Sequence, residues 1–193
     1  MVEKIVLFIH IISVVFMAWP LYALITVNER PKVSAPIGDK VDDFMEGILK
    51  KNAIRCYIFQ TTALLTGIYL TWSNYGNLTL IISNWRLLGK TVGLLLIMGS
   101  LSYVVFYLQP KIDKLFADLK KPQVKEGTTK KIGAIRVTRK KMAAICLFVV
   151  LTVFLLAVQI IIPLPIWANV VLTVLIALFV IRVYKKSVPY GWI

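Results

Sequence analysis

The feature that most constrains this chain is its first apolar stretch, which runs from Ile5 to Val27 without a charged residue. A helix needs about 20 mostly apolar residues to cross the hydrocarbon core of a bilayer. The stretch is longer than the apolar part of a signal peptide, and no small-residue cleavage site closes it. Pro20 is the one residue in it that interrupts a regular helix. We therefore expect a retained transmembrane helix over residues 5–27.

Composition extends this expectation to the whole chain. Hydrophobic residues make up 59% of the 193 residues, and the mean hydropathy is +0.79. Soluble domains are closer to half apolar. Further apolar segments predict helices at about 53–72, 87–108, 142–162 and 166–184, with amphipathic segments at about 39–52 and 111–120. We expect an all-α, polytopic membrane helix bundle with five transmembrane helices in a single domain over residues 1–193.

The distribution of lysine and arginine predicts the orientation of this bundle. Only Lys4, Arg86 and Lys90 of the 23 basic residues fall on one side of the predicted spans. The positive-inside rule then places the N-terminus outside and the C-terminus in the cytoplasm of a cytoplasmic-type cell membrane. This asymmetry accounts for the net charge of +14. It favours a topogenic, lipid-facing function of the basic residues over binding of nucleic acid, so we expect no nucleic-acid partner.

The third connection, from Lys111 to Lys141, is the most basic part of the chain. We expect a membrane-surface loop here that docks on anionic lipid at the cytoplasmic face, or on an acidic partner. The candidate residues for this docking are Lys120, Lys121, Lys130, Lys131, Arg136, Arg139, Lys140 and Lys141.

The single histidine, His10, is the first residue to consider for function, because a ligating side chain at membrane depth is costly unless it has a partner. In the predicted topology it lies roughly 9 Å below the outer surface at 1.5 Å per residue. Lys90 begins the third helix from that same side. Two interpretations stay open: His10 is a ligand of haem or copper, or it forms a hydrogen bond to another helix.

Conventional catalysis finds little support in the sequence. No intramembrane carboxylate exists to pair with His10 as a base or proton relay, and the chain has no nucleotide-binding glycine pattern. We therefore assign no catalytic residue.

Three segments carry a resemblance to known proteins: residues 7–19 around His10, Arg55 with Thr66 and Gly67, and residues 85–90, which end at Lys90. Over about residues 5–118 the chain resembles small membrane proteins of the copper-resistance CopD and the HemJ protoporphyrinogen oxidase types. The resemblance implies that His10 matches the haem b ligand of the HemJ type. Lys90 and Arg55 are candidate neighbours of this ligand.

Together these features predict an accessory subunit of a larger membrane redox or metalloenzyme complex. In this interpretation the chain works beside other membrane subunits and offers a haem b or copper contact at His10. One alternative is a haem-dependent protoporphyrinogen oxidase of the HemJ type. Another is a membrane scaffold without a cofactor.

Overall fold

The computed structural model describes residues 1–27, 37–119 and 127–185, and every element in these ranges is a helix. This confirms the all-α class. Four helices are long and apolar enough to cross a membrane, which suggests a membrane-embedded protein. In chain order the elements are α1 (Val2–Val27), α2 (Lys40–Tyr75), α3 (Leu80–Ser83), α4 (Trp85–Tyr103), the π-helical segment η2 (Val104–Leu108), α5 (Gln109–Leu119), α6 (Thr128–Ile161) and α7 (Ile166–Lys185).

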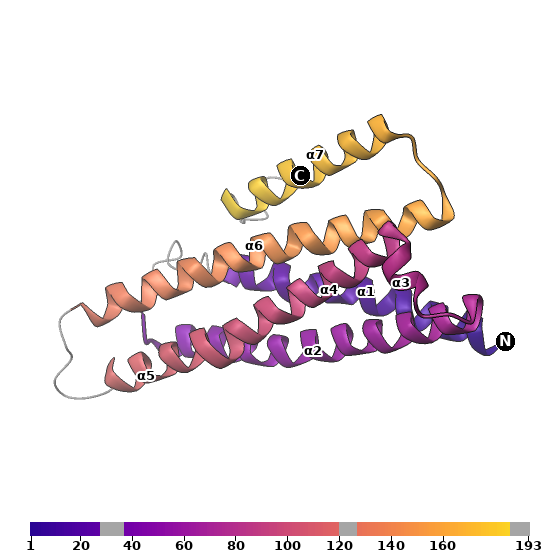
Figure 1. Ribbon diagram of the computed structural model, residues 1–193. Helices are drawn as coiled ribbons and strands as arrows, with labels where there is room; N and C mark the ends of the chain where they lie inside the picture. The colour runs from indigo at the N-terminus through magenta and orange to yellow at the C-terminus, as the bar shows by residue number, and fades with distance from the viewer. Residues whose placement is uncertain (28–36, 120–126, 186–193) are drawn as a thin grey trace.

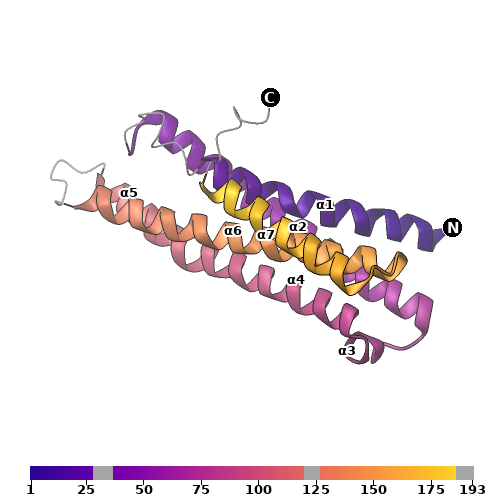
Figure 2. The same ribbon diagram turned by 90° about the horizontal axis from the view of Figure 1, so that it is seen from above.

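The long helices lie roughly lengthwise along one another and alternate in direction (Figure 1). α1 packs mainly against α2, and α6 contacts α1, α4 and α7. The start of α1, the end of α2 and the short α3 share one end of the molecule, whereas the start of α2, α5 and the start of α6 share the other (Figures 1 and 2). The second end is called the basic end below.

The core of the bundle is built on α6. The buried residues Leu147 and Val150 of α6 belong to one apolar cluster with Met17 of α1, Cys56 of α2 and Ile97 of α4. Both cysteines are free and buried. Met17 is 1% exposed, so this side chain is part of the core.

α2 joins the predicted amphipathic segment 39–52 and the predicted span 53–72 into one helix of 36 residues. Asp39 caps its start by accepting a hydrogen bond from the backbone N–H of Lys40, and Gly76 ends it in the left-handed conformation. At 1.5 Å per residue the helix is about 54 Å long, well beyond the ~30 Å of a bilayer core. α2 is not one of the four helices that are apolar enough to span, because polar residues along it lower its hydropathy. Several of these polar side chains, such as those of Asn52 and Gln60, are buried.

α6 begins earlier than the predicted span 142–162, because residues 128–141 are helical and do not form a loop. Their apolar positions pack into a small second core, in which Ile132 lies with Ile112 and Phe116 of α5. α5 corresponds to the predicted amphipathic segment 111–120. We call residues 40–52 of α2, α5, and residues 128–141 of α6 the helical extension. The predicted helices 5–27, 87–108 and 166–184 match α1, α4 with η2, and α7.

Candidate functional site

His10 lies in the contact between α1 and α2. Its Nδ1 atom is 2.9 Å from the hydroxyl oxygen of Thr66. The same hydroxyl also lies 2.6 Å from the backbone carbonyl oxygen of Thr62, one turn earlier in α2. The structure therefore brings together His10 and the Thr66–Gly67 pair that the sequence analysis had placed in the same resemblance.

The hydrogen bond to Thr62 fixes which nitrogen of His10 donates. A threonine hydroxyl has one hydrogen, and Thr66 donates it to the carbonyl oxygen of Thr62. The Thr66 oxygen therefore accepts a hydrogen bond from His10 Nδ1–H. In the neutral imidazole this leaves a lone pair on Nε2, the arrangement in which histidines commonly bind metals.

Gly67 allows the imidazole to approach the backbone of α2. A Cβ atom added at this glycine would lie 3.3 Å from His10 Cε1 and 3.8 Å from Nδ1. The first distance is tighter than ordinary van der Waals contact, so a larger residue would push the ring away from Thr66. Small residues have this function in many contacts between membrane helices.

The two predicted neighbours of His10 differ in their position relative to the imidazole. Lys90 of α4 is half-buried, and its ammonium group interacts electrostatically with the imidazole. Arg55 is exposed, and its guanidinium contacts the side chain of Asn52 at 3.5 Å. Arg55 also lies three turns before Thr66, about 16 Å along the same helix. The expectation that Arg55 is close to His10 is therefore wrong.

His10 cannot complete a closed metal site with the other described residues. Within residues 1–27, 37–119 and 127–185, no group of three or more His, Cys, Asp or Glu side chains is placed to hold a metal ion. The donor chemistry at His10 fits one axial ligand of a haem, a group that needs a single imidazole on one face. A copper site would need further ligands from another molecule.

A second cluster of polar side chains is buried at the basic end, in the helical extension. Arg139 of α6 binds Glu46 of α2 through both terminal nitrogens, and the Nη2–Oε2 distance is 3.1 Å. Arg136 lies 2.8 Å from Asp42 and 3.4 Å from Glu46. Gln109 accepts a hydrogen bond from Arg139 Nη1 at 2.8 Å and donates one to Glu46 at 3.1 Å. We call these five residues the ion-pair network.

This network corrects the predicted membrane-surface loop for two of its residues. Arg136 is 5% exposed and Arg139 is 1% exposed, so neither faces lipid or water. Two buried carboxylates compensate their charges, which is the condition for burying an arginine. Arg136 also lies 5.0 Å from the centre of the Phe116 ring.

The other predicted members of that loop differ from these arginines. Lys130, Lys131 and Lys141 are exposed on α6, and the Lys140 ammonium lies 4.7 Å from the centre of the Tyr184 ring. Lys120 and Lys121 lie outside the described residues. The exposed lysines are the part of the chain that remains suited to anionic lipid.

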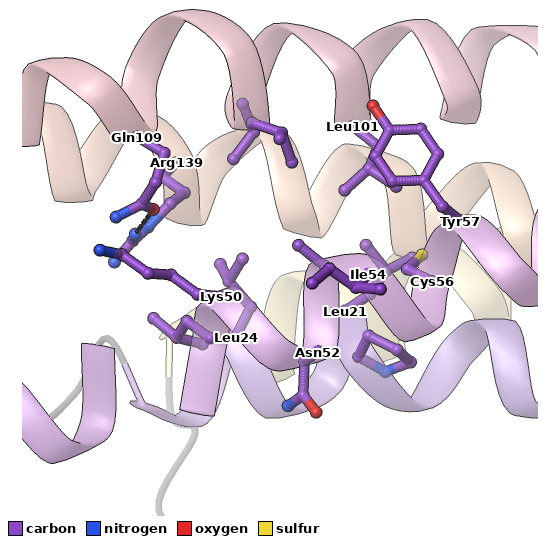
Figure 3. Close-up of a pocket in the computed structure, with 15 residues that line it drawn as sticks. Leu21, Leu24, Lys50, Asn52, Ile54, Cys56, Tyr57, Leu101, Gln109 and Arg139 are labelled. Carbon is purple, nitrogen blue, oxygen red and sulfur yellow. Dashed lines mark hydrogen bonds between the residues drawn. The ribbon is translucent and has the colours of Figure 1, made fainter. Parts of the chain in front are cut away.

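A cavity of about 230 Å³ lies beside the ion-pair network, between α1, α2, α6 and the consecutive helical segments α4, η2 and α5. Figure 3 shows Arg139 and Gln109 meeting at one end of it, and Cys56 and Tyr57 at the other. The wall between these ends is mostly aliphatic and includes Leu21, Leu24, Ile54 and Leu101.

The sequence analysis missed both the network and the cavity. Asp42 and Glu46 are four residues apart and Arg136 and Arg139 are three apart, so each pair lies on one face of its helix. Ile132 and Ile135 each lie four residues before one of these arginines, so they belong to the same face of α6. This helical periodicity was the available signal, because isoleucines and arginines on one face at helical spacing indicate an amphipathic helix and are not expected in a solvated loop.

Comparisons with models of protein families, with curated proteins and with solved structures found no match to this chain. The resemblance to the CopD and HemJ types therefore remains a prediction, and the functional argument depends on the residues themselves.

Proposed function

We propose that this chain is a five-span membrane protein with its N-terminus outside, and that it serves as an accessory subunit of a larger membrane redox or metalloenzyme complex. Its contact with a haem b or copper centre is His10. The observation that carries the proposal is the hydrogen-bond chain from His10 to Thr66 to Thr62, because it places the hydrogen on Nδ1 and the lone pair of the neutral imidazole on Nε2.

The course of the chain supports the five spans. α1 and α4 run in the same direction (Figure 1), so a chain that crosses the membrane in both must return between them. α2 provides that return, and several of its polar side chains, including Asn52, Gln60 and Thr71, are buried in the protein. Most lysines and arginines then lie on the cytoplasmic side. Impermeant thiol reagents should label a cysteine placed at Asn77 from outside the cell, and labelling only in inverted vesicles would contradict this orientation.

Partner subunits follow from the same chemistry. One imidazole supplies one ligand, and the described residues provide no cluster to complete a copper site around it. The remaining ligands or the other face of a haem would come from a second molecule. The membrane scaffold is the second candidate, because the contact between His10 and Thr66 also holds α1 to α2 without any cofactor.

The experiment is purification in mild detergent with native partners, followed by optical and metal analysis of the complex. We expect a haem Soret band or bound copper in the wild type. His10→Gln should remove the signal, because glutamine forms hydrogen bonds but is a poor haem ligand. Thr66→Val is the matched control and should weaken the helix contact while retaining Nε2. A wild-type complex without haem or metal would favour the scaffold, and protoporphyrinogen oxidation by the isolated chain would favour the HemJ type.

We also propose that the exposed lysines of α6 dock on anionic lipid. Each basic residue near such a surface contributes on the order of 1 kcal/mol, and the attraction weakens with salt. Glutamine at the exposed Lys130, Lys131 and Lys141 should reduce binding to vesicles that contain phosphatidylglycerol but not to neutral vesicles. Unchanged binding to both would contradict the proposal.

A further inference from the structure

The cavity beside the ion-pair network contains one buried hydrogen-bond donor without a partner. Arg139 binds Glu46 with its two terminal nitrogens, and Gln109 takes a further bond from Nη1. This head-on arrangement leaves the Nε–H, for which the described residues offer no acceptor. Arg139 is 1% exposed and lines the cavity. Because an unpaired buried donor is costly, an occupant that supplies an acceptor atom would stabilise the site.

The charges around the donor favour an uncharged occupant. Two arginines and two carboxylates, Asp42 and Glu46, compensate one another within the network. The nearby ammonium of Lys50 lies 2.8 Å from Asp113. An anionic head group would add an unbalanced negative charge to a site that is already neutral. A carbonyl oxygen would accept the Nε–H bond without that cost.

The size and walls of the cavity favour an apolar, ring-sized group. A dry apolar cavity of roughly 150 Å³ binds benzene, so about 230 Å³ can hold a larger substituted ring. Ile54 lines the cavity and its side chain is 64% exposed, so this wall of the cavity is also part of the outer surface of α2. A molecule dissolved in the bilayer could therefore enter from the side.

We propose that this cavity binds the head group of a lipid-soluble quinone, with a ring carbonyl accepting a hydrogen bond from Arg139 Nε–H. The aliphatic side chains of Leu21, Leu24 and Leu101 line the cavity (Figure 3) and would contact the ring. This binding site does not depend on a haem or copper contact at His10, because His10 of α1 meets α2 at Thr66, whereas the cavity is lined by residues 49–57 of α2.

The test is a titration of the purified full-length protein with decylubiquinone, decylbenzene and decanoate, measured by calorimetry. We expect saturable binding of the quinone, and at least tenfold weaker binding of decylbenzene, which has the chain and a ring but no carbonyl. Equal affinity for decylbenzene and the quinone, tighter binding of decanoate, or no saturable quinone binding would each overturn the proposal.

Two variants locate the site. Arg139→Lys keeps a cation for Glu46 but removes the Nε–H, and should weaken quinone binding at least tenfold, as loss of a bond to a charged donor does. Ala53→Leu adds three carbon atoms to the cavity wall and should abolish binding. Ala168→Leu in α7, outside the cavity, is the matched control. If Arg139→Lys does not fold, Ala53→Leu decides, and wild-type affinity in that variant would overturn the assignment.

Discussion

The apolar part of the bundle and the helical extension are held together by different interactions. In the apolar part, close contacts such as Gly93 against Val153 and isolated hydrogen bonds such as His10 to Thr66 join the helices. In the extension, the buried ion-pair network lies beside a small core of Ile112, Phe116 and Ile132. Apolar side chains gain little from leaving lipid, so close packing must hold helices there, whereas burial from water can offset the cost of desolvating charges in the extension.

The sharpest way to break this comparison is to remove the carboxylate shared by both arginines. Glu46→Ala leaves Arg136 and Arg139 buried with only Asp42 between them. We expect the free energy of unfolding to fall by about 3–5 kcal/mol, the usual effect of breaking a buried ion pair from one side. Unfolding by SDS in mixed micelles measures it. Glu3→Ala, which removes an exposed carboxylate bonded to Ser73, is the control, and equal losses would show that the network does not hold the extension.

Close packing in the apolar part can be tested with two glycines of α4. A methyl group at Gly93 would collide with Val153 of α6, whereas at Gly99 it would meet no atom within 4 Å. Gly93→Ala should cost about 1–3 kcal/mol of unfolding free energy through overpacking. Gly99→Ala should be neutral or stabilising by up to about 1 kcal/mol, because alanine favours the helix. The same SDS titration compares them, and similar values for both would contradict close packing of α4 on α6.

The contribution of the His10 hydrogen bond should be smaller. Thr66→Val removes the acceptor of Nδ1–H and should cost about 0.6–1.7 kcal/mol, from the average to the maximum found for hydrogen bonds between membrane helices by double-mutant cycles. Thr62→Val is the matched control, because the Thr62 hydroxyl donates its hydrogen bond within its own helix, to the Ile58 carbonyl. Adding His10→Ala to each variant gives a double-mutant cycle. A coupling energy for Thr66 no larger than that for Thr62 would mean that the bond adds no stability.

The smallest effect is expected for the exposed ion pair of the extension. Lys50 and Asp113 are 2.8 Å apart, but their side chains are 47% and 46% exposed. Lys50→Ala should change the free energy of unfolding by less than about 1 kcal/mol, and high salt should remove the difference. Lys51→Ala controls for loss of charge alone. A loss comparable to that of Glu46→Ala would show that burial does not separate the two kinds of ion pair.

The sequence predicted the helices better than their partners. The apolar runs give α1, α4 and α7 because a hydrophobic stretch is a local property. The length of α6 was underestimated, because its first 14 residues contain lysines and arginines that also suit a cytoplasmic loop. The pairing of Arg136 with Asp42 joins residues 94 positions apart. The periodicity within each helix does not predict which carboxylate of α2 pairs with which arginine of α6.

At the candidate site, too, the sequence predicted single residues but not their partners. His10 was identifiable because a lone histidine in an apolar run is rare and costly. Its bond to Thr66 was not determined by the sequence, which left a cofactor and a helix contact as equal interpretations. The cavity was missed because it is formed between helices that are far apart in the sequence, and no local sequence pattern indicates how these helices pack.

The separation of the ion-pair partners along the chain also has a consequence for synthesis. Asp42 leaves the ribosome 94 residues before Arg136, a delay of roughly 5–20 s at typical elongation rates. During that interval the carboxylates of α2 have not met their arginines. These carboxylates lie in the polar first part of α2, where water can solvate them until the arginines have been synthesised. The network can therefore close as a late step, after α6 has emerged, and so it joins the first half of the chain to the second only once both have been made.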